Sequence, residues 1–226
     1  NYNSKRLRAL LKECNALGLP LSRLPQTLEL KSGTADQTEI RPIEIEDLLQ
    51  RTQNVQDLKL IRDLVTTKTV LITGAGGTIG GEITRQIASF KPAKIILLEH
   101  AEWQLYTIER ALADAPHDFA IVPILGDVRD ERLLDKLFAE HQPQLVFHAA
   151  ALKHVPLAEQ NPEITLSINV LGTQAVAKAS AKHKAEAMVL ISTDKAVHPS
   201  SVMGASKRLA EKVISSFGNL SITESI

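Results

Sequence analysis

The chain has 226 residues, of which 44% are hydrophobic and 23% are charged, the composition of an ordinary globular protein. Lys and Arg together number 26 and equal Asp plus Glu, so no net field draws the chain to nucleic acid or to an anionic membrane. The one cysteine, Cys14, excludes an internal disulfide and a thiolate zinc cluster, so we expect a protein of a reducing compartment without a metal.

The first 66 residues are predicted to form an appendage and linker, separate from the domain that follows. Leucines recur at helical spacing within 4–17, which predicts a short amphipathic helix. Residues 39–45 alternate like an edge strand, and helical pieces are expected at 45–49 and 55–64.

No stretch approaches the roughly 20 apolar residues of a transmembrane helix, so we expect no membrane contact from this segment. The sequence begins at Asn1, without Met and without the apolar run of a signal peptide. We therefore expect part of a longer cytoplasmic protein, held at the inner face of the cell membrane if an anchor precedes it.

From residue 67 on, short apolar runs alternate with longer helical stretches, which is the pattern of βαβ units around a parallel sheet. The predicted strands are 69–73, 94–99, 119–125, 145–149 and 187–192, with helices beginning near Thr78, Trp103, Asp130, Glu163 and Val202. Right-handed crossovers then give a doubly wound α/β (Rossmann) sheet of order 3-2-1-4-5, whose ligands bind beyond the carboxyl ends of the strands. We assign residues 67–226 to this domain.

A glycine-rich turn follows the first of these strands directly. Gly74, Gly77 and Gly80 are spaced three apart, and Thr78 and Ile79 open the next helix. Glycines permit a tight turn and a close approach of the backbone to a pyrophosphate, whose charge the amides of the helix N-terminus stabilise. A mere tight turn is the alternative, but the strand, the glycines and the helix together favour dinucleotide binding.

Acidic residues end the next two strands. Glu99 comes about 20 positions after the glycines, where a carboxylate would accept hydrogen bonds from both ribose hydroxyls of adenosine. Because it would repel a 2′-phosphate, Glu99 favours NAD over NADP, the alternative being a solvated strand end. Asp127, followed by Val128, ends the third strand, where an Asp also serves as the cap of a following helix.

Small and polar residues follow the fourth strand. Three alanines, which are often only packing residues, would let the backbone pass close under a cofactor: Ala149, Ala150 and Ala151. Lys153 and His154 lie in a polar loop at the mouth of the site, where the histidine is a general base, a metal ligand or a surface residue, although no second ligand lies at zinc spacing. Asn169 lies inside a predicted helix despite its poor helix propensity, so we expect it to hold backbone or water near the site.

The fifth strand ends in Thr193, Asp194 and Lys195, and Met203 and Lys207 follow on one face of the next helix. This spacing is similar to the Tyr-x-x-x-Lys pair of short-chain dehydrogenases, with Met203 in the place of the tyrosine. A thioether cannot take a proton, so the ordinary tyrosine mechanism is excluded. If these residues have only a structural role, Met203 is a core residue, and Asp194 and Lys195 form a surface ion pair.

Three stretches, 98–106, 150–156 and 192–208, together resemble the membrane-associated UDP-N-acetylglucosamine 4,6-dehydratases and capsular polysaccharide biosynthesis proteins, which belong to the extended short-chain dehydrogenases. The resemblance runs from about Ile43 to about Val213 and implies an enzyme that uses NAD on a UDP-sugar and forms a homo-oligomer. It also implies a C-terminal substrate domain, which we expect to be absent here. A nucleotide-sugar 4-epimerase and a non-catalytic dinucleotide-binding module are the alternatives.

The resemblance also implies roles for single residues. Hydride would leave C4 of the sugar, the C5 proton would then be acidified, water would leave from C6, and hydride would return to C6. Asp194 would protonate the departing C6 hydroxyl and Lys195 would be the base at C5. Lys207 would hold the nicotinamide ribose and Asp127 the adenine amino group. The acceptor of the C4 hydroxyl proton stays open between Thr193, Asp194 and a water held by Lys207.

Overall fold

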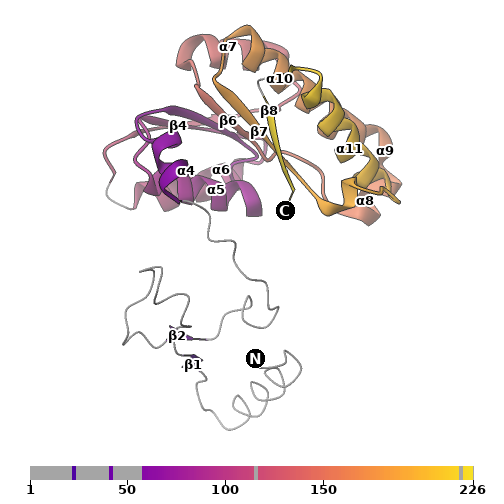
Figure 1. The fold of residues 1–226 in the computed structure, drawn as a ribbon, viewed down its shortest axis with the longest axis horizontal. Helices are drawn as coiled ribbons and strands as arrows, with labels where there is room; N and C mark the ends of the chain where they lie inside the picture. The colour runs from indigo at the N-terminus through magenta and orange to yellow at the C-terminus, as the bar shows by residue number, and fades with distance from the viewer. Residues whose placement is uncertain (1–21, 24–40, 43–57, 115–116, 219–220, 226) are drawn as a thin grey trace. The chain divides into compact units, whose positions relative to one another are not determined.

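The computed structural model describes residues 22–23, 41–42, 58–114, 117–218 and 221–225 (Figure 1). The chain forms two compact units, Asn1–Leu58 and Lys59–Ile226. In the first unit, strands β1 (Ser22–Arg23) and β2 (Arg41–Pro42) pair antiparallel, and β2 lies inside the predicted edge strand. The helices expected at 4–17 and 45–49, and Cys14, lie outside the described residues.

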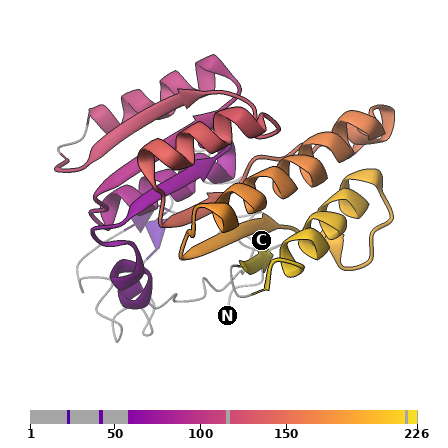
Figure 2. The ribbon, with the colours of Figure 1, turned by 90° about the horizontal axis from the view of Figure 1, so that it is seen from above.

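A parallel sheet of six strands organises the second unit, in the order β5-β4-β3-β6-β7-β8 (Figures 1 and 2). Its strands are β3 (Thr69–Thr73), β4 (Lys94–Glu99), β5 (Ala120–Leu125), β6 (Leu145–His148), β7 (Ala187–Ser192) and β8 (Ser221–Ser225). Numbered within this unit, the first five strands have the order 3-2-1-4-5, which confirms the predicted doubly wound Rossmann fold.

The sixth strand corrects the sequence analysis, which expected the sheet to end with the fifth. Strand β8 pairs in parallel with β7, with Ser221 opposite Met188 and Ser225 opposite Ser192. Its one apolar residue, Ile222, gave no hydrophobic run to detect. The strand forms because an edge position draws its stability from backbone pairing with the neighbouring strand.

The helices are α4 (Leu58–Val65), α5 (Thr78–Ser89), α6 (Glu102–Ala113), α7 (Glu131–His141), α8 (Val155–Gln160), α9 (Pro162–Leu166), α10 (Thr173–Lys182) and α11 (Val202–Ser215). Helices α5, α6, α7, α9 and α11 begin within one residue of their predicted starts. A π-helical turn η1 (Ser167–Gly172) joins α9 to α10, and a 3-10 turn η2 (Asp194–Ala196) follows β7. Helix α8 was not predicted, because the sequence from Leu152 was taken for a polar loop. Among the described helices, none is long and apolar enough to cross a membrane.

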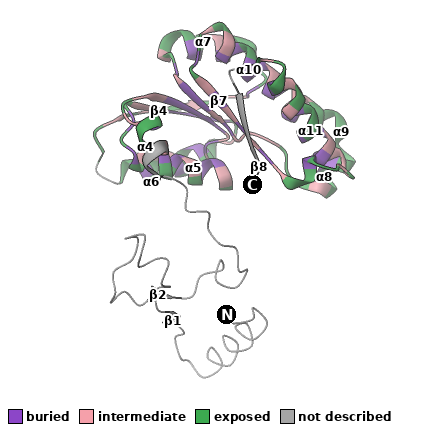
Figure 3. Cartoon of the chain, in the orientation of Figure 1, coloured by how far each residue is buried: buried purple, intermediate pink, exposed green. Residues whose placement is uncertain are grey.

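Hydrophobic residues are buried on both faces of the sheet (Figure 3). Along β3, Leu71 packs into one core cluster, and Val70 and Ile72 pack into the other. The first cluster is completed by α7, α10 and α11, and the second by α4, α5 and α6, which lie on opposite sides of the sheet in Figure 1. The connection between β5 and α7 therefore changes faces, and β3 and β6 lie side by side where the strand order reverses.

Candidate functional site

The glycine turn lies beyond the carboxyl end of β3. Gly74 has a φ of 65°, and a Cβ atom there would come within 2.7 Å of the Cα of Ala150. At Gly80 a Cβ would lie 1.9 Å from the carbonyl oxygen of Gly74. A Cβ at Gly77 would meet that same oxygen alone, at 3.3 Å. Packing therefore requires glycine at Gly74 and Gly80, while Gly77 keeps one side of the turn open.

The three alanines after β6 pass directly beneath this turn. The N–H of Ala149 donates to the carbonyl of Thr73 at 3.1 Å, and the backbone of Ala150 is what a Cβ on Gly74 would strike. Ala149, Ala150 and Ala151 are all half-buried. The structure thus brings the glycines and alanines together at the junction of β3 and β6, as the sequence placed them.

Helix α5 begins at the turn without a side-chain cap, since its N-cap residue is Gly77. In contrast, Asp130 caps α7 and Ser201 caps α11. An uncapped N-terminus presents amide donors and a positive partial charge to an anion. The Lys153 ammonium lies 3.4 Å from Oγ1 of the exposed Thr78, so a second positive charge stands at the same end. The half-buried Ile79 follows, and the whole arrangement fits a pyrophosphate.

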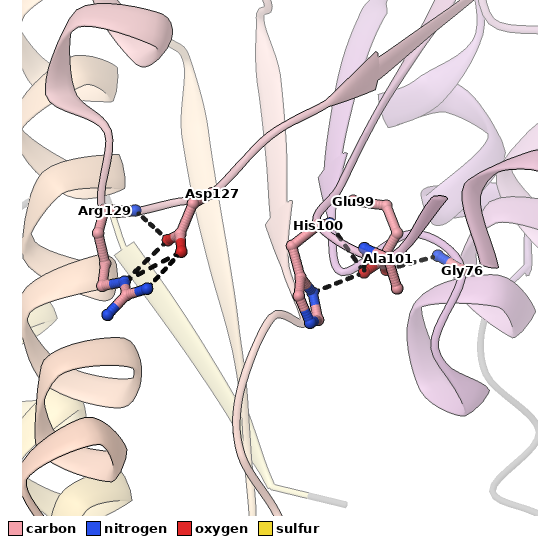
Figure 4. A network of polar contacts seen from close by, with 6 residues as sticks. All are labelled: Gly76, Glu99, His100, Ala101, Asp127 and Arg129. Atoms are coloured by element: carbon pink, nitrogen blue, oxygen red, sulfur yellow. Dashed lines mark hydrogen bonds and ion pairs between the residues drawn. The ribbon is translucent and has the colours of Figure 1, made fainter. Parts of the chain in front are cut away.

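Glu99 is buried and its carboxylate is already bonded (Figure 4). The carboxylate accepts hydrogen bonds from the backbone N–H groups of Gly76 at 3.1 Å, His100 at 2.9 Å and Ala101 at 3.2 Å. Nδ1 of His100 also lies 2.9 Å from Oε1. The alternative of a solvated strand end is therefore wrong: Glu99 ties the glycine turn to the segment that leads into α6.

Asp127 lies beyond β5 and pairs with Arg129 (Figure 4). Its Oδ1 accepts from the N–H of Arg129 at 2.8 Å and from Nε at 3.0 Å, and these hydrogen bonds lower the pKa of Asp127. The alternative role of helix cap is wrong, because Asp130 caps α7. Val128 is buried in the core, which fixes the position of Asp127 at the mouth of the sheet.

A chain of buried hydrogen bonds crosses the floor of the site. Oγ1 of Thr73 lies 2.6 Å from Nδ1 of His148, and Nε2 of His148 lies 2.9 Å from Oγ1 of Thr173. Because the Thr173 hydroxyl donates to the carbonyl of Asn169 at 2.7 Å, we assign the imidazole hydrogen to Nε2 and let Nδ1 accept from Thr73. Burial, and secondarily the charge of Lys207, lower the pKa of His148 to about 3, so the ring is neutral.

Sequence analysis did not select His148 as a site residue. The available signal was its position as the last residue of a buried strand, directly before the three alanines. A polar residue at such a position needs hydrogen-bonding partners, but the sequence alone does not show which residues supply them.

Asn169 fixes the loop that follows β6. Its Oδ1 accepts from the N–H of Leu152 at 2.8 Å, and its Nδ2 donates to the carbonyl of Leu152 at 3.0 Å. The same Nδ2 lies 2.9 Å from Oγ of Ser206, which donates to the carbonyl of Met203. Asn169 thus holds backbone near the site from within a π-helical turn, a geometry that is frequent at functional sites. Lys153 and His154, the next residues of the loop, are exposed.

Lys207 lies below the end of β7. It is 6% exposed, and its Nζ donates to the carbonyl of Ile191 at 2.6 Å. Desolvation lowers the pKa of Lys207 to about 8, against the opposing effect of Glu211, whose carboxylate accepts from the hydroxyl of Ser192. Met203, one turn earlier on α11, is buried among core residues. This is the position expected of a residue with only a structural role.

Lys207 makes the stability of the domain depend on pH. Between about pH 8 and pH 10.5 the unfolded chain retains a Lys207 proton that the folded chain has lost, so the free energy of unfolding should rise with pH. From pH 7.5 to 9.5 the parent should gain about 1 to 2 kcal/mol relative to a Lys207→Met variant in urea unfolding. If the free energy of unfolding changed with pH in the same way in both proteins, Lys207 would not have the lowered pKa that its burial predicts.

Thr193, Asp194 and Lys195 form an exposed polar corner after β7. The Thr193 hydroxyl donates to Oδ1 of Asp194 at 3.0 Å, and Nζ of Lys195 lies 3.4 Å from the same oxygen. These two contacts lower the pKa of Asp194, which is therefore ionised at neutral pH. An ionised carboxylate cannot donate a proton, so an acid role for Asp194 requires that a substrate cover it and raise its pKa.

Comparisons with known proteins agree with this geometry. A family model described as polysaccharide biosynthesis protein matches residues 70–225. The capsular polysaccharide biosynthesis protein CapD of Staphylococcus aureus is 43% identical over 215 residues, which are 95% of this chain and 36% of CapD. A UDP-glucose 4-epimerase of Rickettsia canadensis is 38% identical over 65% of this chain and 42% of its own.

Two further matches are informative. A UDP-N-acetylglucosamine 4,6-dehydratase (inverting) of Campylobacter jejuni is 34% identical over 68% of this chain and 44% of its own. Among solved structures, Pen from Bacillus thuringiensis covers 71% of this chain and 49% of its own with a TM-score of 0.64 and 30% identity. The chain therefore spans about a third to a half of the length of the proteins it matches.

Proposed function

Since the chain belongs to the polysaccharide biosynthesis protein family, we propose that it is the dinucleotide-binding part of a nucleotide-sugar 4,6-dehydratase of surface glycan synthesis. The observation that carries the proposal is the polar corner Thr193, Asp194 and Lys195, placed above a buried Lys207 at the end of β7. A dehydration across C5 and C6 needs both an acid and a base beside the sugar, and this corner offers a carboxyl group and an amine.

The cofactor that we propose is NAD, which when bound would supply the acceptor and later the donor of the sugar's hydride. The residues that would hold it meet at the carboxyl edge of the sheet. The open side of Gly77 and the uncapped start of α5 would take the pyrophosphate, with the Lys153 ammonium beside it. The alanines after β6 would lie under the nicotinamide, and Asp127 would face the adenine.

The side chains of the corner would divide the proton transfers. Lys195 would take the C5 proton as the neutral amine, and Asp194, protonated when the sugar covers it, would protonate the C6 hydroxyl as it leaves. Lys207 would hold a ribose hydroxyl and place a positive charge under the reacting end. Met203 is buried and has no proton to exchange, so the C4 hydroxyl proton would pass to Thr193, to Asp194 or to water.

Product analysis tests this function. The complete protein, incubated with UDP-N-acetylglucosamine and NAD, should release a 4-keto-6-deoxy sugar that mass spectrometry detects as the loss of one water. A product epimerised at C4 would favour the second candidate function, a 4-epimerase. The similarity to the Rickettsia UDP-glucose 4-epimerase supports this candidate. If the protein bound the dinucleotide but formed no product, it would be a non-catalytic dinucleotide-binding module.

A Gly77→Val variant tests the pyrophosphate cradle. The added side chain would fill the open side of the turn, so NAD affinity in calorimetric titration should fall by about 100-fold or more, equivalent to two lost charge-assisted hydrogen bonds. Gly81→Ala is the matched control, because a Cβ there meets neighbouring atoms no closer than 3.6 Å. If Gly77→Val bound NAD as tightly as the parent, the pyrophosphate would not bind at this turn.

A further inference from the structure

One side of helix α11 contacts the polar corner and the residues on either side of it. Spacings of three and four put the four contacting residues next to one another on the helix: Gly204, Lys207, Arg208 and Glu211. Lys207 holds the carbonyl of Ile191 at the end of β7, as described above. The other three approach residues 192–197, which include the corner itself.

Both ends of the corner are hydrogen-bonded to this helix. Before the corner, the hydroxyl of the buried Ser192 donates to the carboxylate of Glu211. After the corner, the Arg208 guanidinium donates to the carbonyl of Val197, and its Nη1 also lies 3.5 Å from the carbonyl oxygen of Ala196. Two residues of α11 that lie about one turn apart therefore hold the two ends of the corner.

Between these two ends the backbone of the corner lies directly against α11. A Cβ atom on Gly204 would come within 2.5 Å of the carbonyl oxygen of Lys195. The corner therefore cannot move closer to the helix, and the hydrogen bonds of Glu211 and Arg208 oppose its movement away. Helix α11 thus sets the position of the corner.

Packing does little to orient the side chains of the corner. The Asp194 side chain is 80% exposed and the Lys195 side chain is 57% exposed. Two backbone hydrogen bonds inside the segment, from the N–H of Ala196 to Thr193 and from the N–H of Val197 to Asp194, are both 3.1 Å long. Such local bonds fix the shape of a turn but not its position on the domain.

We propose that Arg208 and Glu211 are positioning residues, which hold the two ends of the polar corner so that Asp194 and Lys195 meet the sugar in a fixed geometry. The inference rests on the dehydratase function proposed above. A displacement of about 1 Å from the productive geometry can lower a rate about 100-fold. Arg208 acts through the corner, so its loss should slow the reaction of the sugar and leave NAD binding at the glycine turn unchanged.

An Arg208→Met variant of the complete protein tests one end. Its kcat for release of the 4-keto-6-deoxy sugar should fall about 100-fold, while the KM for UDP-N-acetylglucosamine and the Kd for NAD stay near the parent values. Arg208→Lys keeps a cationic donor and should recover part of the rate. Lys212→Met, at an exposed lysine one turn further along α11, is the matched control and should turn over like the parent.

Glu211 is tested by two variants that separate its hydrogen bond from its charge. Glu211→Gln keeps an acceptor for the Ser192 hydroxyl, whereas Glu211→Ala removes both the acceptor and the charge. Glu211→Ala should lose about 100-fold in kcat, and Glu211→Gln should recover most of it. If both variants were equally slow, Glu211 would act through its charge and not by holding Ser192, which would refute its positioning role.

Amide hydrogen exchange followed by mass spectrometry measures the position of the corner without substrate. In Arg208→Met the amides of Ala196 and Val197 should exchange about tenfold faster than in the parent, the size of one lost hydrogen bond. The amide of Gly74, which donates to the carbonyl of Leu98 at 2.8 Å in the glycine turn, should exchange at the parent rate.

Two results would overturn the inference. One is an Arg208→Met variant that keeps the kcat of an active parent, and the other is an equal loss of kcat in Arg208→Met and Lys212→Met. If the parent itself forms no product, the proposed function fails instead. The amide exchange of residues 196 and 197 then still decides whether Arg208 holds the corner, so the two failures are distinguishable.

Discussion

A Lys195→Ala variant of the complete protein should release product about 100- to 10,000-fold more slowly than the parent, the usual contribution of a positioned base. Oxidation at C4 precedes the removal of the C5 proton, so the variant should still show NADH absorbance on mixing with UDP-N-acetylglucosamine. The C5 hydrogen of the sugar should no longer exchange with deuterated solvent, because the base that removes it is missing.

Deuterium incorporation followed by mass spectrometry separates these steps. Lys178→Ala is the matched control, since Lys178 is an exposed lysine of α10 that pairs with Glu131. It should exchange and turn over like the parent. Exchange at C5 at the parent rate in Lys195→Ala would show that another group is the base, and the proposed division of labour would have to be abandoned.

An Asp194→Asn variant should lose dehydration to a similar degree, about 100- to 10,000-fold, but for a different reason. The amide keeps the size of the side chain and removes the acid that protonates the C6 hydroxyl, while Lys195 still removes the C5 proton. Deuterium should therefore enter C5 although no water leaves C6. Asp114→Asn, at an exposed aspartate that ends α6, is the control.

The ionisation state of Asp194 bears on the same assignment. Thr193 and Lys195 lower the pKa of Asp194 in the uncovered site, so the acid form has to be produced when substrate covers the corner. Loss of C5 exchange in Asp194→Asn together with the loss of dehydration would mean that Asp194 also acts before the elimination, for example on the C4 hydroxyl.

The sequence predicted the elements with strong periodicity and missed those without it. The bounds of β3 and β4 agree with the prediction, because each is a continuous apolar run between turn residues. Helix α8 follows a polar loop and is only six residues long, so its pattern is too short to detect. Strand β8 has one apolar residue and depends on its neighbour, which a local pattern cannot show.

For the site, residue types and positions were predictable, but burial and partners were not. The acid at Glu99 was found from its place at the end of β4, yet the three backbone donors that enclose it come from two separate turns. The identity of Asp127 did not distinguish a helix cap from a partner of Arg129. His148 was passed over because its two threonine partners lie about 75 and 25 positions away, a separation that only the parallel sheet and the helix packed on it bring together.

The buried imidazole of His148 has a practical consequence for titrations of this protein. Its pKa of about 3 and its bonds to Thr73 and Thr173 keep the ring in one protonation state from mildly acidic to alkaline solution. His148 therefore contributes no limb to a pH–rate profile in neutral or alkaline solution, whereas the buried Lys207, with a pKa of about 8, should contribute one. In a ¹⁵N spectrum the ring resonances of His148 should stay fixed over this range, which makes His148 an internal reference for titration curves.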